Sequence, residues 1–256
     1  MSLSLPKTPT FRLDGQRALV AGASRGIGLG CAVALAEQGA HVVCAARGMD
    51  QLNEAVDAIK DAGHSAQAVQ MDVADTQGVK ALFNEHEAFD VVVNSAGIAR
   101  HAPALETQID DYQAVMDINV RGAFVLAAEG ARGMAAASKP GSIIHISSQM
   151  GHVGGIERAV YCASKHALEG MTKAMAIEWA PHRIRINTIC PTFIRTPLAA
   201  VTLEDPEKRA WVESKIKLGR VGEIEDIMGA VAYLASDASS LVTGTSLLID
   251  GGWTAG

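Results

Sequence analysis

Short apolar runs rich in β-forming residues alternate with longer helical patterns along almost the whole chain. The sequence predicts strands at residues 17–22, 41–46, 65–71, 90–95, 141–147, 184–189 and 246–250. Amphipathic stretches lie between them, for example at 26–40, 49–62 and 168–180. Strands separated in this way by helices form right-handed crossovers, which require a parallel sheet with helices on both faces. We therefore expect an α/β fold, a doubly wound parallel sheet of about seven strands.

The alternation continues from residue 17 to 250 without a linker, a repeat or a low-complexity tract. With 48% hydrophobic and 20% charged residues, the 256 residues can build one large core, so we expect a single domain over 1–256. The least regular stretch, 196–223, contains a charged run at 204–217 that is typical of a solvated amphipathic helix. Trp211 in this run suggests that segment 196–220 forms a lid over the substrate.

Charge and hydropathy argue against several classes of protein. A net charge of −6 and a pI near 5.7 do not fit a nucleic-acid binder. No apolar run approaches the roughly 18 residues that span a membrane, and the N-terminus does not resemble a signal peptide. The four cysteines form no C-x-x-C pair and the eight histidines are scattered. We expect a soluble, cytoplasmic protein without a structural metal, whose partner is a small molecule.

A glycine-rich loop, V-A-G-A-S-R-G-I-G at 20–28, follows the first predicted strand and opens the first predicted helix. Gly22, Gly26 and Gly28 would allow a tight turn and a close approach of the backbone to a pyrophosphate. The helix N-terminus would then offer free N–H groups and a favourable dipole to that anion. A plain strand-to-helix turn is the alternative, but the position at the start of a β–α–β array favours nucleotide binding.

The motif Y-C-A-S-K at 161–165 places Tyr161 and Lys165 four residues apart, on one face of a helix. Together with the glycine loop, it makes the chain resemble the short-chain dehydrogenase/reductase family in its single-domain, Rossmann-type form. The resemblance covers roughly Leu13 to Trp253. It rests on motifs in the family's order, namely 21–28, Asp72-Val73, N-S-A-G at 94–97, Asn119, Ser148, 161–165, N-T-I-C-P at 187–191 and D-G-G at 250–252.

Oxidising an alcohol with a nicotinamide requires a group that exchanges a proton with the substrate oxygen. A tyrosine with a pKa near 10 is a poor base, and lowering that pKa by roughly three units requires about 4 kcal/mol. A cation about 4 Å away, at an effective dielectric constant near 20, supplies about that much. Lys165 is therefore a suitable partner for Tyr161. The alternative is a partly buried tyrosine beside a lysine whose charged end reaches solvent.

The resemblance implies a role for each of four catalytic residues. Tyr161 would be the general acid/base, and Lys165 would lower its pKa and hold the nicotinamide ribose. Ser148, thirteen residues upstream of Tyr161, would bind the substrate oxygen in preference to the adjacent Ser147. Asn119 would anchor a water that relays protons through Lys165. The alternatives are a strand-end hydroxyl for either serine and a buried asparagine satisfied by backbone for Asn119.

The resemblance also implies the cofactor contacts. Asp72 and Val73 would hold the adenine, N-S-A-G would form the floor of the cleft, and Ile194 and Thr196 would contact the carboxamide. The chain departs from the family at Pro191-Thr192, where Pro-Gly is usual, which makes the pocket geometry less certain. The expected cofactor-binding residues are Gly22, Ser24, Arg25, Gly26, Ile27, Gly28, Arg47, Asp72, Val73, Asn94, Ala96, Gly97, Tyr161, Lys165, Pro191, Ile194 and Thr196. Asp72 could instead be a plain turn residue, and Asn94 could be largely structural.

The end of the second predicted strand bears on the choice of cofactor. Sites for NAD(H) place an acid there, whereas this chain has Ala46 followed by Arg47. Arg47 and Arg25, with Ser24 as a hydroxyl donor, would suit a 2′-phosphate in charge and in geometry. Either arginine alone could be a solvated surface charge. We expect a preference for NADP(H), with NAD(H) as the alternative.

The substrate is less sharply predicted. Polar candidates suggest a polyol, a sugar acid or another small oxygenated substrate, although each is more often a solvated loop residue. The expected substrate residues are Gln149, His152, Arg158, Thr192, Phe193 and Trp211, and Arg100, His101 and Glu157 lie near them. A 3-oxoacyl carrier thioester is the alternative within the family. A nucleotide-sensing regulatory protein is disfavoured, because a pure sensor does not need the four catalytic residues.

The resemblance further implies a homotetramer or homodimer. Its contacts would come from long helices near 112–136 and 159–180. Small residues at 122–138 would allow helices to approach closely, although they could equally pack within one chain.

Overall fold

The structure, a computed structural model, describes residues 3–256 and, at position 201, the backbone alone. Seven parallel strands form one sheet in the order β3-β2-β1-β4-β5-β6-β7. The strands are β1 Arg17–Ala21, β2 His41–Ala46, β3 Ala66–Gln70, β4 Val91–Asn94, β5 Gly141–Ile146, β6 Ile184–Pro191 and β7 Ser246–Ile249. The predicted doubly wound α/β fold is confirmed, and each strand lies where the sequence predicts one.

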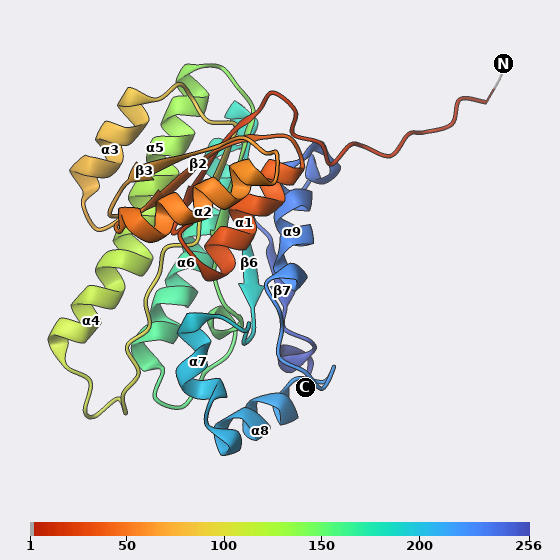
Figure 1. The fold of residues 1–256 in the computed structure, drawn as a ribbon. Coiled ribbons are helices and arrows are strands. Elements are labelled where there is room, and N and C mark those ends of the chain that lie inside the picture. The colour runs from red at the N-terminus through yellow and green to blue at the C-terminus, as the bar shows by residue number, and fades with distance from the viewer. Residues whose placement is uncertain (1–2) are drawn as a thin grey trace.

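Helices cover both faces of the sheet (Figure 1). The helices are α1 Gly26–Glu37, α2 Met49–Asp61, α3 Thr76–Glu85, α4 Ile109–Met116, α5 Ala123–Ala136, α6 Ala159–Trp179, α7 Pro197–Leu203, α8 Pro206–Lys215 and α9 Glu225–Ala235. Buried side chains of α1, α2 and α9 pack on one face of the sheet, and those of α3, α5 and α6 pack on the other.

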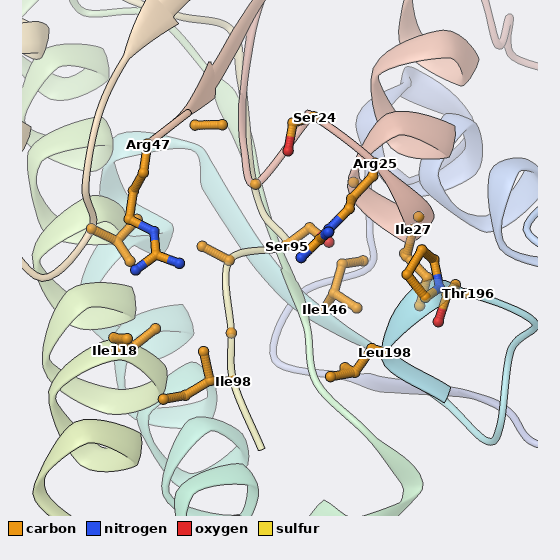
Figure 2. Close-up of a pocket in the computed structure, with 18 of the residues that line it drawn as sticks. Ser24, Arg25, Ile27, Arg47, Ser95, Ile98, Ile118, Ile146, Thr196 and Leu198 are labelled. Atoms are coloured by element: carbon orange, nitrogen blue, oxygen red, sulfur yellow. The ribbon is translucent and has the colours of Figure 1, made fainter. Parts of the chain in front are cut away.

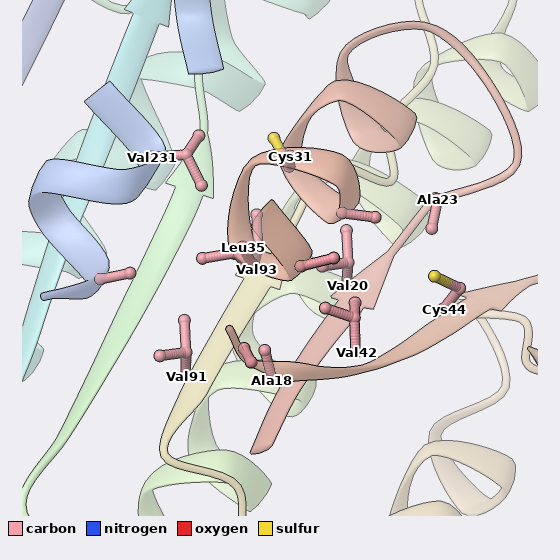
Figure 3. Close-up of a cluster of buried hydrophobic side chains, with 14 of the residues drawn as sticks. Ala18, Val20, Ala23, Cys31, Leu35, Val42, Cys44, Val91, Val93 and Val231 are labelled. Carbon is pink, nitrogen blue, oxygen red and sulfur yellow. The ribbon is translucent and has the colours of Figure 1, made fainter. Parts of the chain in front are cut away.

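Two hydrophobic cores result, one on each face. Figure 3 shows part of the first, where Val20, Val42 and Val93 of adjacent strands meet Leu35 of α1. Leu19, next to Val20 in β1, lies in the second core, because successive side chains of a strand point to opposite faces. A parallel sheet buried on both faces explains why its strands are continuously apolar rather than alternating.

The strand order reverses at β1, which lies between β2 and β4. Loops that leave the carboxyl ends of β1 and β4 therefore diverge and leave a crevice, the usual ligand site of an open α/β sheet. The glycine loop follows β1, and N-S-A-G begins at the end of β4. The fold thus brings motifs from distant parts of the sequence to one edge of the sheet.

The predicted long helix over 112–136 is not regular. A π-helical segment, Asp117–Gly122, joins α4 to α5. A Cβ atom on Gly122 would lie 2.7 Å from the carbonyl oxygen of Val73, so the backbones approach too closely there for any other residue. Such widened turns occur mostly at functional sites, and this one contains Asn119. The expectation of a second long helix at 159–180 is confirmed by α6.

The irregular stretch after β6 forms α7 and α8, which lie beyond the carboxyl ends of β6 and β7 (Figure 1). The carboxylate of Asp205 caps α8 by accepting hydrogen bonds from the N–H groups of Glu207 and Lys208, and Pro206 occupies the first turn. A small separate core at Leu203, Val212, Ile216 and Val221 holds these helices in place. The helix expected from the charged run is thus present. None of the helices described between residues 3 and 256 is both long and apolar enough to cross a membrane.

Candidate active site

The glycine loop makes its turn through close backbone contacts. Gly22 has a φ of +82°, and a Cβ atom on it would lie 2.8 Å from the backbone nitrogen of Ala96. A Cβ atom on Gly28, in the first turn of α1, would lie 2.0 Å from the carbonyl oxygen of Gly22. Only glycine satisfies both restrictions, so the loop is held tightly against N-S-A-G and the start of α1. This packing leaves a cavity in front of the helix N-terminus.

That cavity has a volume of about 980 Å³, well suited to a dinucleotide (Figure 2). It is lined by fourteen of the expected cofactor residues, namely Gly22, Ser24, Arg25, Gly26, Ile27, Gly28, Arg47, Asp72, Val73, Ala96, Gly97, Tyr161, Lys165 and Thr196. Sequence reasoning missed further lining residues, among them Asp50, Gln51, Ile98, Ile118 and Leu198. The apolar ones carry no signal in the sequence, because they resemble ordinary core residues.

Two arginines reach into this cavity from its two sides. Arg25 projects from the glycine loop and Arg47 from the end of β2, as Figure 2 shows. Neither forms an ion pair with any residue that the structure describes. Ala46 lines the cavity at the end of β2, where an acid would repel a phosphate. The donor set at this end therefore fits an anionic group.

The other end of the cavity contains Tyr161 and Lys165, in the first turns of α6. Lys165 is buried, and its Nζ donates a hydrogen bond to the carbonyl oxygen of Ile146 at 3.0 Å. The same nitrogen lies 5.6 Å from the centroid of the Tyr161 ring. Ser148 follows the end of β5, and its Oγ accepts a hydrogen bond from the N–H of Met150 at 3.1 Å. Lys165 thus lies beside Tyr161 within the cofactor cavity.

A second, smaller cavity of about 130 Å³ adjoins the first. The two share Ile27, Ser147, Tyr161, Thr196 and Leu198, so Tyr161 stands in the wall between them. Four predicted substrate residues line the small cavity: Gln149, Arg158, Thr192 and Phe193. Ser148, Pro191 and Ile194, which were predicted for other roles, line it as well. Pro191 and Ile194 therefore lie on the substrate side of the wall rather than in the cofactor cavity.

Three residues that line the small cavity each have a buried polar atom without a hydrogen-bond partner among the described residues. The atoms are Ser147 Oγ, Gln149 Oε1 and Thr192 Oγ1. Buried polar atoms in folded proteins are nearly always paired, so such exceptions call for an explanation. Because these atoms have almost no accessible surface, a ligand in the small cavity would bond to them only after their side chains turn towards it. Thr192, which departs from the usual glycine, adds its hydroxyl to the wall as the sequence suggests.

Comparison with known proteins agrees with this arrangement. Residues 22–254 match the family model described as enoyl-(acyl carrier protein) reductase. D-erythrulose reductase of Gallus gallus is 35% identical over 245 residues, which cover 96% of this chain and 98% of the relative. L-xylulose reductase of Bos taurus is 36% identical over 245 residues, covering 96% and 99%. The chain belongs to the short-chain dehydrogenase/reductase family.

A solved structure of a family member supports the same conclusion. Gluconate 5-dehydrogenase of Burkholderia cenocepacia, in complex with NADP and tartrate, superimposes with a TM-score of 0.93 at 37% identity. The alignment covers 96% of this chain and 98% of that one. The family predicted from the motifs is thus confirmed, and with it the enzyme class, an NAD(P)-dependent short-chain dehydrogenase/reductase that acts on CH–OH groups.

In this short-chain dehydrogenase/reductase, Asn119 and Asn94 are engaged with the protein itself. The amide of Asn119 donates to the carbonyl oxygen of Ile98 at 2.9 Å and accepts from its N–H at 2.9 Å. It also donates to Ser164 Oγ at 3.1 Å. Asn94, buried beneath the cofactor cavity, accepts from the N–H of Ala96 at 3.2 Å. These contacts support the structural alternatives for both residues, and a water relay would need an atom of Asn119 other than its side-chain amide.

Two predicted substrate residues, His152 and Trp211, do not line the small cavity. Trp211 packs edge-on against Trp253, with ring centroids 5.6 Å apart, because α8 presents this ring to the small core. The imidazole of His152 lies 3.8 Å from the carboxylate of Glu169, away from the wall that Tyr161 occupies. Direct substrate contacts of these two residues stay a prediction.

Glu169 is the centre of a buried polar cluster behind the catalytic residues. Its carboxylate accepts hydrogen bonds from Thr188 Oγ1 at 2.9 Å and from Ser246. His152, Glu169 and Cys190 bring one possible metal ligand each to within 4.8 Å of one another. Burial, reinforced by the nearby carboxylate, raises the pKa of Cys190 to about 12, so its thiol is neutral and donates to Glu169 at 3.4 Å. The cluster is thus a network of neutral donors around one carboxylate.

Proposed function

We propose that this chain is an NADP(H)-dependent oxidoreductase that interconverts a secondary alcohol and a ketone in a polyol, a sugar acid or another small oxygenated substrate. The observation that carries the proposal is the position of Tyr161 in the wall shared by the large and the small cavity. A proton carrier at that point can reach a substrate in the small cavity beside a nicotinamide in the large one. When bound, the nicotinamide supplies or accepts the hydride.

The chain's own residues would handle the proton. In the direction of reduction, the Tyr161 hydroxyl donates its proton to the carbonyl oxygen, and in oxidation it takes the proton of the alcohol. Ser148 Oγ, on the same cavity wall, holds that oxygen by a hydrogen bond. The Lys165 ammonium, fixed by the carbonyl of Ile146, favours the phenolate and contacts the nicotinamide ribose. Asn119 fixes the backbone of Ile98 at the edge of the cofactor cavity.

The preference for NADP(H) rests on Arg25 and Arg47. Both are exposed, both line the cofactor cavity, and Ala46 leaves room for a phosphate between them. The relative from Burkholderia cenocepacia was solved with NADP, which supports the same choice. NAD(H) remains the alternative cofactor.

The size and polarity of the small cavity support a small polyhydroxylated substrate. Its volume of about 130 Å³ is below the roughly 300–1,000 Å³ of pockets for drug-sized ligands. Polar side chains line it, among them Ser148, Gln149 and Thr192, and these suit a substrate rich in hydroxyl groups. The names of the relatives, reductases of D-erythrulose and L-xylulose, point to the same substrate class. A 3-oxoacyl thioester is less suited to so small a cavity.

The remaining proposals concern the whole molecule. We propose one domain over residues 1–256, with segment 196–220 as a substrate lid, in a cytoplasmic protein without nucleic-acid partners. A homotetramer or homodimer is supported by exposed apolar side chains on three helices: Ile109 and Tyr112 on α4, Phe124 on α5 and Ile177 on α6. Pairing of these helices between copies would cover the apolar surface.

The test is a spectrophotometric assay of the purified full chain with both nicotinamide cofactors. The substrates would be a panel of short alditols and ketoses, aldonates and keto acids, and 3-oxoacyl thioesters. We expect turnover of polyols, sugars or sugar acids, with NADP(H) preferred. Turnover of the thioesters alone would contradict the substrate proposal, and cofactor binding without turnover of any compound would favour the sensing alternative.

A further inference from the structure

Arg158 places a positive charge in the wall of the small cavity. It stands immediately before α6, three residues ahead of Tyr161, and lines the small cavity but not the cofactor cavity. Its guanidinium lies 5.5 Å from the centroid of the Phe193 ring, which lines the same cavity. The aromatic face holds the flat group in position by a cation–π contact. The charge is therefore held on the side of the cavity away from the cofactor.

This guanidinium has no carboxylate partner. Among residues 3–256, no Asp or Glu oxygen approaches it within 4.0 Å, although ten ion pairs of other lysines and arginines meet that limit. Its only hydrogen-bond contact to a described residue joins Nη1 to the His101 ring, so Nε and Nη2 remain available. The guanidinium is partly buried, and this burial lowers the pKa of Arg158. An unpaired cation facing a cavity is costly unless a ligand brings the opposite charge.

His101 completes the arrangement as a neutral acceptor. Its ring packs edge-on against the Tyr161 ring, with centroids 5.9 Å apart, and contacts the Arg158 guanidinium. Partial burial and the neighbouring Arg158 lower the pKa of His101 to about 4. The imidazole is therefore uncharged at neutral pH, so it accepts a hydrogen bond from Arg158 and does not add to the positive charge. It links the guanidinium to the catalytic tyrosine.

We propose that the substrate carries a carboxylate, which Arg158 binds at the end of the small cavity away from the nicotinamide. This inference rests on the proposed function, because it assigns the substrate class of that same site. The available Nε and Nη2 donors form the fork that matches a carboxylate. Gln149 and Thr192, which line the same cavity, would then lie beside the part of the substrate between the carboxylate and the reacting carbon. A short sugar acid meets these requirements better than a neutral polyol.

The experiment compares aldonates with alditols of the same carbon skeleton and configuration, using the purified full chain and NADP. We expect kcat/KM to favour the aldonate by about tenfold or more, and Arg158→Met to remove that preference mainly through KM, as loss of a charge-assisted hydrogen bond does. Arg158→Lys keeps the charge without the fork and should retain part of the preference. Arg132→Met is the matched control, because Arg132 is an exposed arginine of α5 that pairs with Glu129.

Calorimetric titration with tartrate, in the presence of oxidised NADP, provides a readout that needs no turnover. Tartrate should bind the wild type and Arg132→Met alike and bind Arg158→Met at least about tenfold more weakly. Equal turnover of aldonates and alditols, unchanged in Arg158→Met, would overturn the carboxylate inference and leave the proposed function standing. Arg158-dependent tartrate binding without turnover of any compound would overturn the proposed function and support the anion site. Thermal unfolding of each variant establishes that it is folded.

Discussion

The Nζ atom of Lys165 lies 5.6 Å from the centroid of the Tyr161 ring, and a 3.0 Å hydrogen bond to the carbonyl oxygen of Ile146 holds it there. The two side chains are one helical turn apart on α6, as their spacing requires. The acceptor of this hydrogen bond, the carbonyl oxygen of Ile146, lies at the end of β5. The sheet therefore positions the ammonium relative to the phenol. Both residues line the cofactor cavity, and Tyr161 also lines the small one, which leads to the first prediction.

Replacing Tyr161 by phenylalanine should remove most of the catalytic rate. The variant lacks the proton carrier but keeps the ring, so kcat should fall by roughly 10²–10⁴-fold while the affinity for NADPH stays nearly unchanged. Steady-state kinetics and fluorescence titration with NADPH measure the two quantities. Tyr233→Phe, in α9, is the matched control.

The same measurements on Lys165→Met test whether the lysine has two functions. Because Lys165 also lines the cofactor cavity, this variant should lose both kcat and affinity for NADPH. A Tyr161→Phe enzyme that retains more than about a tenth of kcat would be incompatible with general acid/base catalysis by the phenol.

Ser148 and Ser147 allow a paired test of substrate binding. Ser148→Ala should lower kcat by roughly a hundredfold, as loss of a hydrogen bond to the reacting oxygen does. Because Ser148 is the proposed donor to the substrate oxygen, Ser147→Ala should have a much smaller effect. Steady-state kinetics of both variants decide between them. A larger loss of kcat in Ser147→Ala than in Ser148→Ala would show that Ser147, not Ser148, binds the substrate oxygen.

The space at Ala46 should control the choice of cofactor. An aspartate there would repel a phosphate held by Arg25 and Arg47, so Ala46→Asp should lower kcat/KM for NADP(H) by about tenfold or more. The value for NAD(H) should change little or rise. Ala46→Asn is the control of equal size without charge. Steady-state kinetics with both cofactors measure these values. A wild type that prefers NAD(H) would contradict the proposal that Arg25 and Arg47 bind the 2′-phosphate of NADP(H).

His145 should make the fold less stable in acid. It is completely buried, and burial, with a further contribution from the Lys165 ammonium, lowers its pKa from 6.5 to about 4, while Glu169 acts in the opposite direction. Between these values the unfolded chain binds a proton that the folded chain does not, so the free energy of unfolding decreases as the pH falls from about 6.5 towards 4. At about 1.4 kcal/mol per pKa unit, the total loss is up to about 3 kcal/mol.

Urea unfolding across this pH range measures the effect. His145→Gln keeps a polar side chain beside Asn94, whose amide lies 3.4 Å from His145 Nδ1, but it does not titrate. Its stability should therefore depend less on pH than that of the wild type. His64→Gln, an exchange outside both cavities, is the control. An equal pH dependence in His145→Gln and wild type would show that other groups cause the acid sensitivity.

The exposed apolar residues of α4, α5 and α6 predict self-association. Light scattering at micromolar concentration should give the mass of a tetramer or a dimer of the 26.8 kDa chain. Phe124→Glu and Ile177→Glu should shift the distribution to smaller species, because each places a charge on an apolar face. Leu241→Glu is the control, since Leu241 is even more exposed than Phe124 and Ile177 but lies between α9 and β7. A monomeric wild type would contradict the proposal.

Much of the fold could be predicted because the burial of each strand and helix determines the pattern of apolar residues along it. Apolar runs such as V-V-V at 91–93 report strands buried on both faces, and the spacing of Gly22, Gly26 and Gly28 reports a turn that only glycine can make. The π-helical segment at 117–122 could not be predicted in this way. It arises where the backbone of Gly122 meets Val73, a contact between residues 49 positions apart.

The substrate side of the site shows the same division. His152 and Trp211 lie in the part of the sequence where substrate residues were expected. In the structure, His152 lies beside the buried carboxylate of Glu169 and Trp211 packs against Trp253. In contrast, His101 and Arg158 meet although 57 residues separate them, and the Arg158 guanidinium brings a positive charge to the wall of the small cavity. Sequence spacing reports only neighbours along one helix or strand, so it cannot tell which side of a loop residue faces the cavity.

By itself, the sequence determined the order of strands and helices, the cofactor loop and the Tyr161–Lys165 pair. Each of these depends on residues within a few turns of one another, whose geometry follows from regular secondary structure. The tertiary structure decided which loop side chains line the small cavity and left Arg158 without a carboxylate partner. Those outcomes depend on how β4, β5 and β6 bring their carboxyl ends together, because packing between distant segments sets the distance and the burial of each charge.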